Sequence, residues 1–426
     1  MTKFNNSKKK LKIAEKYIPL GSQTFSKSRL VLPEKISPFF IKKSKDSFFW
    51  DVDNNIYIDL SNGLASVTLG HQNKVVDNAV TNQMKKGVTH SLSTELEAKV
   101  AKQICDLVDA VEMVRFCKNG TDATSAAIRV ARAFTNKKKI IFCGYHGWQD
   151  WYAAATSRDL GTLNDIKKYS INIRFNNFDD LKIISKLKDV AAVIMEPMNR
   201  EFPLPGFLKQ VRKLCNQKKI ILIFDETITG FRYSEKGAQS IFKIKPDLTT
   251  FGKGIANGYP LSVLAGRRKF MKTVKDVFFS GTFFGETLSL AAASKTIEVM
   301  KNKNVCKKIK NNGLFLEKET NKIIKKNNLS KFIKLSGHPS WIFFNFYSHG
   351  KVKSDDVYIS FLRNMFRNGI FNQGTHNLSY AQNRRIINRI IIKYNKIFQQ
   401  IKNDLESNAN LKKIKKLKIK EIFRTR

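Results

Sequence analysis

Long apolar runs are absent from the 426-residue sequence, and none approaches the roughly 18 residues that a bilayer-spanning helix needs. The N-terminal segment MTKFNNSKKKLKIAEKY has no apolar signal core, so we expect a protein that is neither exported nor embedded in a membrane. Cysteine is also scarce, since the chain has five and none of them forms a CxxC pair. This pattern is typical of reduced thiols and predicts a cytoplasmic protein.

Several catalytic signatures are missing as well. The six histidines show no metal-ligand spacing, so we predict no metal site. The GxSxG turn of many hydrolases and the GxxxxGK[ST] phosphate loop do not occur. Hydrophobic residues nevertheless make up 42% of the chain and aromatic residues 11%, which is typical of a globular protein.

Acidic residues are few, with 35 against 77 basic ones, and the net charge is +42. A basic nucleic-acid-associated protein without catalysis is therefore one functional hypothesis. The basic residues are spread along the whole chain, which favours a compositional bias over a dedicated nucleic-acid surface. The basic stretch 411–426 is compatible with an anionic surface, although a solvated helix end is the simpler interpretation.

From about residue 95 onward, apolar segments alternate with amphipathic ones. This alternation predicts a mostly parallel sheet with helices on both faces, and therefore an α/β fold. Beyond about residue 320, shorter strands mix with Lys-rich helices, which indicates a second, α+β domain. The predicted strands include 111–117, 139–143, 190–195, 220–224, 246–251 and 341–346, with two more around an Asp-Asn-Asn turn within 48–59.

A glycine-containing turn follows the first of these strands. Lys118-Asn-Gly-Thr121 precedes a helix whose apolar stripe runs from Ala123 to Phe134. Free backbone amides and the helix dipole favour a phosphate at such a position. Taken alone, the turn is more often an ordinary helix cap.

An acid and a lysine follow two successive strands. Strand 220–224 ends in Asp225, whose carboxylate either faces a ligand crevice or caps the next helix. Lys253 lies between two glycines after strand 246–251, so we expect its amine to project into the same crevice. Tyr145 follows strand 139–143 and either stacks on a flat ligand or packs in its loop. His146 is interpreted as a structural or hydrogen-bonding residue.

Together these segments resemble the class III aminotransferases, a branch of the fold type I pyridoxal-phosphate enzymes. The most specific pieces are FDETITGFR at 224–232 and KPDLTTFGKGIANGYP at 245–260. RFCKNGTDAT at 115–124, YHG at 145–147 and SGT at 280–282 follow the family order. Within the class, LSTELE at 92–97 and KGAQ at 236–239 make the chain most similar to the glutamate-1-semialdehyde 2,1-aminomutase branch.

The resemblance implies a fold, a cofactor and an assembly. The fold is a mostly parallel, seven-stranded-type sheet in a large domain at 61–319, with a smaller α+β domain built from residues 1–60 and 320–426. The cofactor is pyridoxal 5′-phosphate, and the assembly is a homodimer with shared active sites.

The resemblance also implies roles for the residues around the cofactor ring. Lys253 would hold the cofactor as a Schiff base and shuttle a proton, and Asp225 would pair with the pyridinium nitrogen. Tyr145 would stack on one face of the ring, and Thr227, at a position that is usually Val, would pack on the other.

For the phosphate, the resemblance implies the amides of Gly120 and Thr121, together with Thr282 of the neighbouring subunit. Glu196 is expected near the cofactor or substrate. The branch usually binds the substrate carboxylate through an Arg in an Asn-Ser-Pro-Val-Arg segment. Here Phe25-Ser-Lys-Ser-Arg29 stands nearby, which makes Arg29 a candidate.

Glu286 departs from the family pattern, which commonly has an Asn after Gly281-Thr282. An acid there suits a polyhydroxyl or cationic substrate, unless it forms a salt bridge. The leading hypothesis is therefore amino-group transfer through Lys253, with glutamate-1-semialdehyde converted to 5-aminolevulinate. The alternative acceptor is another carbonyl, such as a sugar or cell-surface precursor.

Overall fold

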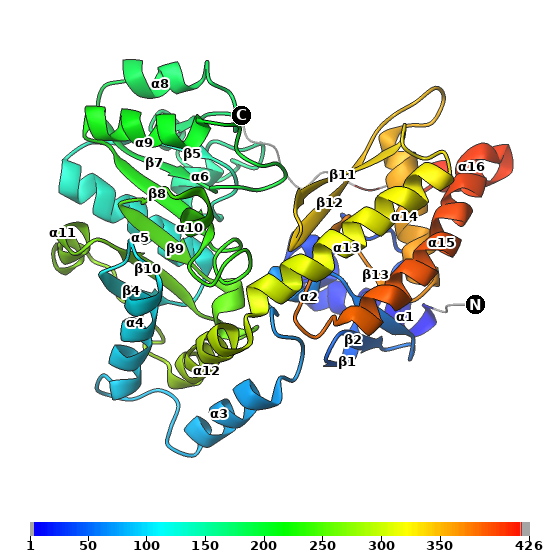
Figure 1. The fold of residues 1–426 in the computed structure, drawn as a ribbon, viewed down its shortest axis with the longest axis horizontal. Coiled ribbons are helices and arrows are strands. Elements are labelled where there is room, and N and C mark those ends of the chain that lie inside the picture. The colour runs from blue at the N-terminus through cyan, green and yellow to red at the C-terminus, as the bar shows by residue number, and fades with distance from the viewer. Residues whose placement is uncertain (1–3, 418, 420–426) are drawn as a thin grey trace. The chain divides into compact units, whose positions relative to one another are not determined.

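The computed structural model describes residues 4–417 and 419. This chain divides into two compact units (Figure 1). Unit 1 comprises residues 4–64, 69–72 and 308 onward, and unit 2 comprises 65–68 and 73–307. The domain boundaries that we expected after residues 60 and 319 stay a prediction.

Unit 2 is built on a seven-stranded sheet with the order β4-β10-β9-β8-β7-β5-β6. Strand β10 is antiparallel to both of its neighbours, and every other neighbouring pair is parallel. The predicted mostly parallel sheet is therefore confirmed. The strands are β4 (Met113–Cys117), β5 (Lys139–Cys143), β6 (Ser170–Asn172), β7 (Val190–Met195), β8 (Ile221–Glu226), β9 (Leu248–Phe251) and β10 (Ser262–Gly266).

Helices cover both faces of this sheet because its central strands are apolar on both sides. On β8, Ile223 packs with α5 (Gly120–Thr135), whereas Leu222 and Phe224 pack with α8 (Leu181–Lys186) and α9 (Phe207–Lys218). Alternate side chains of one strand thus enter two different cores, as the pleat requires. The helix predicted from the stripe 123–134 is α5, although its last aromatic, Phe134, is 45% exposed.

Unit 2 has further helices, of which α3 (Lys74–Met84) lies beside α12 (Thr287–Lys303) and away from the sheet (Figure 1). The others are α4 (Glu95–Leu107), α6 (Asp150–Ala153), α7 (Asn164–Lys167), α10 (Ala238–Phe242), η3 (Lys253–Ala256), α11 (Arg268–Met271) and η4 (Lys272–Asp276).

Unit 1 contains two smaller sheets, with the orders β1-β2-β3-β13 and β11-β12-β14. The predicted turn between β2 and β3 is present, and the Asp51 carboxylate accepts from the backbone of Asp53 and Asn55 to hold it. The strands are β1 (Ile41–Lys45), β2 (Phe48–Asp51), β3 (Ile56–Asp59), β11 (Ile333–His338), β12 (Trp341–Phe346), β13 (Ile370–Phe371) and β14 (Thr375–Asn377).

The helices of unit 1 include long ones from the C-terminal part of the chain. They are α1 (Asn5–Tyr17), η1 (Pro19–Gly21), η2 (Phe25–Lys27), α2 (Asn62–Ala65), α13 (Val305–Lys326), α14 (Ser354–Arg367), α15 (Arg384–Glu406) and α16 (Asn408–Lys415); α13 begins in unit 2, and Ala65 belongs to unit 2. Residues 411–415 of the basic stretch expected at 411–426 form the end of α16, and residues 418 and 420–426 lie outside the described residues. No helix in the described part of the chain is long and apolar enough to cross a membrane.

The central strand β8 offers a test of this packing. We expect Ile223→Ala, at a fully buried position, to lower the free energy of unfolding by about 2–5 kcal/mol through lost burial and a residual cavity. Ile241→Ala removes the same atoms from a position that is 41% exposed, and should change the free energy of unfolding by less than about 0.5 kcal/mol. Urea unfolding followed by circular dichroism measures both. Equal midpoint shifts would contradict the packing described.

Candidate active site

Three turns of unit 2 meet at one edge of the seven-stranded sheet. Strand β4 points the same way as the parallel set, because it is antiparallel to β10 and β10 is antiparallel to β9. The carboxyl ends of β4, β8 and β9 therefore share the edge at which α/β sheets bind ligands. The methyl group of Thr227 marks the meeting point. A Cβ atom on Gly120 or on Gly252 would each lie 3.1 Å from it.

Lys253 is separated from the end of β9 by one residue, Gly252, and begins the short helix η3. Its backbone is left-handed, with φ of +45°. A Cβ atom at either flanking glycine would come too close to a neighbouring side chain, so glycine is required on both sides of the lysine. Burial lowers the pKa of its amine to about 8, although the carboxylates of Asp225 and Glu196 act in the opposite direction. A much larger fraction of the amine is therefore neutral near pH 7 than for an ordinary lysine, as a nucleophile and base requires.

Asp225 lies within β8, which extends two residues beyond its predicted end at Phe224. Its buried carboxylate accepts from Thr250 Oγ1 at 2.9 Å and from the Thr227 amide at 3.1 Å, and it faces His146 Nδ1 at 2.9 Å. Burial alone would raise its pKa, but the hydrogen bonds and charge of His146, together with Thr227, bring the pKa below the usual value. The site therefore contains a buried carboxylate that stays ionised.

His146 is fixed on both ring nitrogens. Its Nε2 lies 3.2 Å from the carbonyl oxygen of Cys143, which can only accept, so Nε2 donates. Its Nδ1 faces the Asp225 carboxylate, and an ionised carboxylate there also requires a donor. The histidine interpreted from the sequence as hydrogen-bonding therefore braces the central acid.

The phosphate turn, which we define as residues 118–121, runs from the end of β4 into the first residues of α5. Amides in the first turn of a helix have no acceptor within the helix, so those of Gly120 and Thr121 are suited to an anion. The loop after β5 closes over this end of α5, since the Trp148 amide donates to Thr121 Oγ1 at 3.3 Å. Gly147 makes that approach possible, with φ of +109° and no space for a Cβ beside Thr121.

Tyr145 and Glu196 lie on the neighbouring strand ends. The Tyr145 amide donates to Glu196 Oε1 at 2.9 Å, while its ring is half exposed and meets Tyr152 edge-on at 5.7 Å. Asn199 donates to the other Glu196 oxygen at 2.9 Å. Burial raises the pKa of Glu196. The structure thus brings Glu196 beside Tyr145 and within the electrostatic reach of Lys253.

Three predicted residues have other surroundings. Thr282 lies in an exposed turn before α12. Arg29 belongs to unit 1, where it pairs with Glu15 at 2.9 Å. Glu286 is the N-cap of α12 and pairs with Lys118 at 2.8 Å, so its carboxylate has partners within the protein.

Thr250 was not identified from the sequence, although it donates to the central acid. The available signal was a hydroxyl side chain on a buried strand just before Lys253. Among the described residues, no group of three or more His, Cys, Asp or Glu side chains could hold a metal ion.

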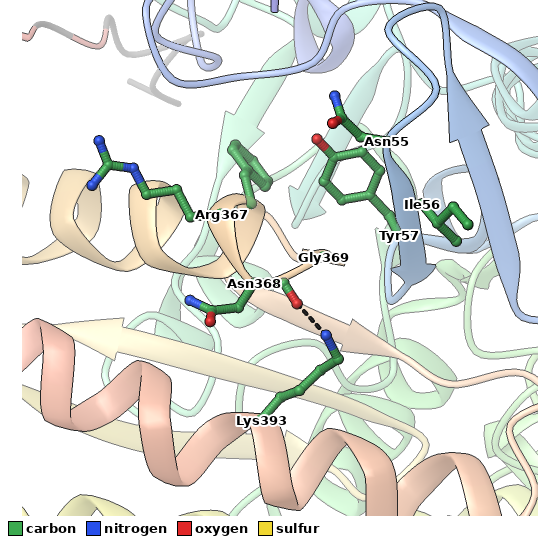
Figure 2. Close-up of a pocket in the computed structure, with 8 residues that line it drawn as sticks. Asn55, Ile56, Tyr57, Arg367, Asn368, Gly369 and Lys393 are labelled. Carbon is green, nitrogen blue, oxygen red and sulfur yellow. Dashed lines mark hydrogen bonds between the residues drawn. The ribbon is translucent and has the colours of Figure 1, made fainter. Parts of the chain in front are cut away.

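A separate pocket of about 340 Å³ lies in unit 1 (Figure 2). Its Lys393 donates to the Asn368 carbonyl oxygen just beyond the end of α14, and the Arg367 side chain points away from Lys393. The lysine therefore satisfies a carbonyl oxygen at the C-terminal end of α14. We assign the candidate active site to unit 2.

The class III aminotransferase family model matches residues 32–402. The chain belongs to the class III aminotransferase family. It is 38% identical to glutamate-1-semialdehyde 2,1-aminomutase of Nitrosopumilus maritimus, over 69% of this chain and 77% of that protein. It is 34% identical to 3-aminobutyryl-CoA aminotransferase of Cloacimonas acidaminovorans, over 80% and 83%. The PLP-bound FumI protein of Sphingopyxis sp. MTA144 has a TM-score of 0.87 at 25% identity, covering 96% of this chain and 99% of that one.

Pyridoxal 5′-phosphate is therefore the cofactor, and the chain is a fold type I aminotransferase or aminomutase. The site fits this group on its own geometry. It offers helix N-terminal amides for a phosphate, an ionised buried acid for a ring nitrogen, and a lysine whose amine has a lowered pKa. Family membership sets aside the hypothesis of a nucleic-acid-associated protein without catalysis.

The amine of Lys253 gives a direct test of this electrostatic balance. In cofactor-free protein, we expect its acetylation rate to rise as the pH passes through about 8. Asp225→Asn should move that midpoint to lower pH, because the carboxylate raises the pKa of the amine. Mass spectrometry of briefly acetylated protein measures the rate, with the exposed Lys102 as the comparison. Identical pH profiles for Lys253 and Lys102 would refute the assigned environment.

Proposed function

We propose that this chain is a glutamate-1-semialdehyde 2,1-aminomutase, which exchanges the positions of an amino group and a carbonyl to form 5-aminolevulinate. The observation that supports it most is the 38% identity to an aminomutase, across a segment that includes most of the family domain. A second aminomutase, from Methanosarcina acetivorans, is 31% identical over 84% of this chain.

The proposed roles follow from the geometry of unit 2. When bound, the cofactor's pyridine ring supplies an electron sink for the substrate carbon that loses a proton. Asp225 holds the proton of the ring nitrogen, and His146 keeps that carboxylate ionised and oriented. Lys253 binds the cofactor and then removes and returns the substrate proton at its Nζ atom, which the lowered pKa favours.

The remaining contacts orient the cofactor. The amides of Gly120 and Thr121 hold the phosphate at the start of α5. Tyr145 and Thr227, which lie on two turns of the same sheet edge, would hold the ring between them. Glu196, hydrogen-bonded to the Tyr145 amide, would lie near the cofactor or substrate. Arg29 is retained as a candidate for the substrate carboxylate.

A second candidate is an intermolecular aminotransferase that acts on another carbonyl. The 34% identity to a 3-aminobutyryl-CoA aminotransferase supports it. Trp148, which is 69% exposed beside the phosphate turn, would suit a larger acceptor such as a sugar or cell-surface precursor. For the location we propose the cytoplasm, which is compatible with the five free cysteines.

We also propose a homodimer in which Thr282 reaches the phosphate of the partner. Exposed apolar side chains surround the turn that carries Thr282, with Phe278 86% and Phe283 59% exposed. Hydrogen bonds from Thr287 to the Val88 carbonyl oxygen join this turn to residues 84–92, where Met84 and Leu92 are also exposed. Exposed apolar side chains on two segments that are joined in this way favour a partner chain.

The first experiment adds pyridoxal phosphate and then substrates to the purified protein. We expect a visible absorbance band in the wild type and none in Lys253→Ala. Glutamate-1-semialdehyde should then yield 5-aminolevulinate without a separate amino donor.

The outcomes separate the candidates. Consumption of an added amino donor, with no 5-aminolevulinate, would replace the aminomutase by an intermolecular aminotransferase. A band of equal strength in Lys253→Ala would refute the role of that lysine.

The dimer has its own test. We expect Phe283→Glu to weaken self-association by at least about tenfold, because it places a charge in an apolar contact. Sedimentation at several concentrations measures this, and Phe202→Glu, at another half-exposed position of unit 2, is the matched control. A monomeric wild type, or equal effects of both changes, would contradict the proposed surface.

A further inference from the structure

An ion pair joins the phosphate turn to the start of α12. Lys118 Nζ lies 2.8 Å from Glu286 Oε2 and 3.4 Å from Ser289 Oγ. Only 17% of the lysine side chain and 13% of the glutamate side chain are exposed. A pair this shielded from solvent is screened less by salt than a surface pair.

Glu286 is also committed to its own helix. Its carboxylate accepts from the Leu288 amide at 2.6 Å, and from the amide and hydroxyl of Ser289 at 3.2 and 2.7 Å. Burial would raise its pKa, but the contacts with Lys118 and Ser289 hold it below the usual value. The acid is therefore ionised at neutral pH and oriented before any ligand arrives.

The phosphate turn is packed on its inner side by small groups. Ser262 donates to the Lys118 carbonyl oxygen at 3.4 Å, and the Thr227 methyl group closes the space beside Gly120. These contacts fix the turn toward Gly252 and leave the side chain of Lys118 as the link to α12. Lys118 thus joins the turn that carries the Gly120 and Thr121 amides to a helix outside the cofactor site.

We propose that Lys118 and Glu286 are a positioning pair, which holds the amides of the phosphate turn in register for the cofactor phosphate. Lys118 acts through its bond to Glu286, and its charge is neutralised there. The inference rests on the proposed seat of the phosphate at Gly120 and Thr121. It gives Glu286 a role in cofactor affinity in place of a contact with substrate.

Two single variants distinguish positioning from simple attraction of the phosphate. Lys118→Met breaks the pair, and Glu286→Gln breaks it while keeping an oxygen to cap α12. If the pair positions the turn, both should weaken binding of pyridoxal phosphate by about tenfold, or about 1.4 kcal/mol. The double variant should resemble either single one, because one interaction has been removed.

The measurement is a titration of cofactor-free protein, followed at the visible band, with pyridoxal phosphate and with pyridoxal. Pyridoxal lacks the phosphate, so its affinity should change by less than about twofold in all variants. Lys102→Met removes one positive charge from an exposed pair on α4 and controls for net charge. If a single variant fails to fold, the double variant, which leaves no unpaired charge, carries the test.

The outcomes are distinct from those of the proposed function. A wild type that binds no pyridoxal phosphate would refute the cofactor site itself. Unchanged or tighter binding in Glu286→Gln would overturn the positioning role, because it would mean that Lys118 attracts the phosphate directly. Equal losses for pyridoxal and its phosphate would also overturn it, since the effect would then not pass through the phosphate turn.

Discussion

The buried carboxylate of Asp225 is the constraint on which the site depends. An ionised acid in a sheet core is unfavourable unless donors surround it. Here Thr250 and the Thr227 amide supply two donors, and His146 Nδ1 lies 2.9 Å from the carboxylate as the third partner. The same negative charge raises the pKa of Lys253, but burial has the larger effect and lowers that pKa to about 8. The acid and the lysine are therefore tuned together, and neither environment can be understood without the other.

The sheet topology makes this arrangement possible. Asp225, Thr250 and His146 come from or follow three different strands, β8, β9 and β5, whose carboxyl ends lie on one edge. Because these strands are parallel, each crossover returns the chain to the same edge with a new side chain. The apolar strand interiors provide the rigidity, and the polar residues at the strand ends provide the chemistry. Because the strands supply the rigidity, the short contacts of the site can form beside exposed loops such as the one that carries Trp148.

Much of this architecture could be predicted from the sequence. Strands 139–143, 190–195 and 341–346 are confirmed residue for residue, because continuous or alternating apolar runs mark them. The end of β8 was placed at Phe224, since charged residues are rarely buried in a strand, yet Asp225 and Glu226 continue it. Two of the partners of Asp225, His146 and Thr250, lie far along the chain and leave no local signal. Thr250 was missed for the same reason, as its function depends on a residue 25 positions away.

Lys118 and Glu286 show how this limit affects functional interpretation. In the sequence, Lys118 was only the first residue of the predicted phosphate turn, and Glu286 was either a substrate contact or a salt-bridge residue with no named partner. The structure makes them a single interaction across 168 positions. A departure from a family pattern is therefore informative only together with its spatial partner. When that partner is internal, the departure concerns how the site is held, and the substrate must be inferred from other residues.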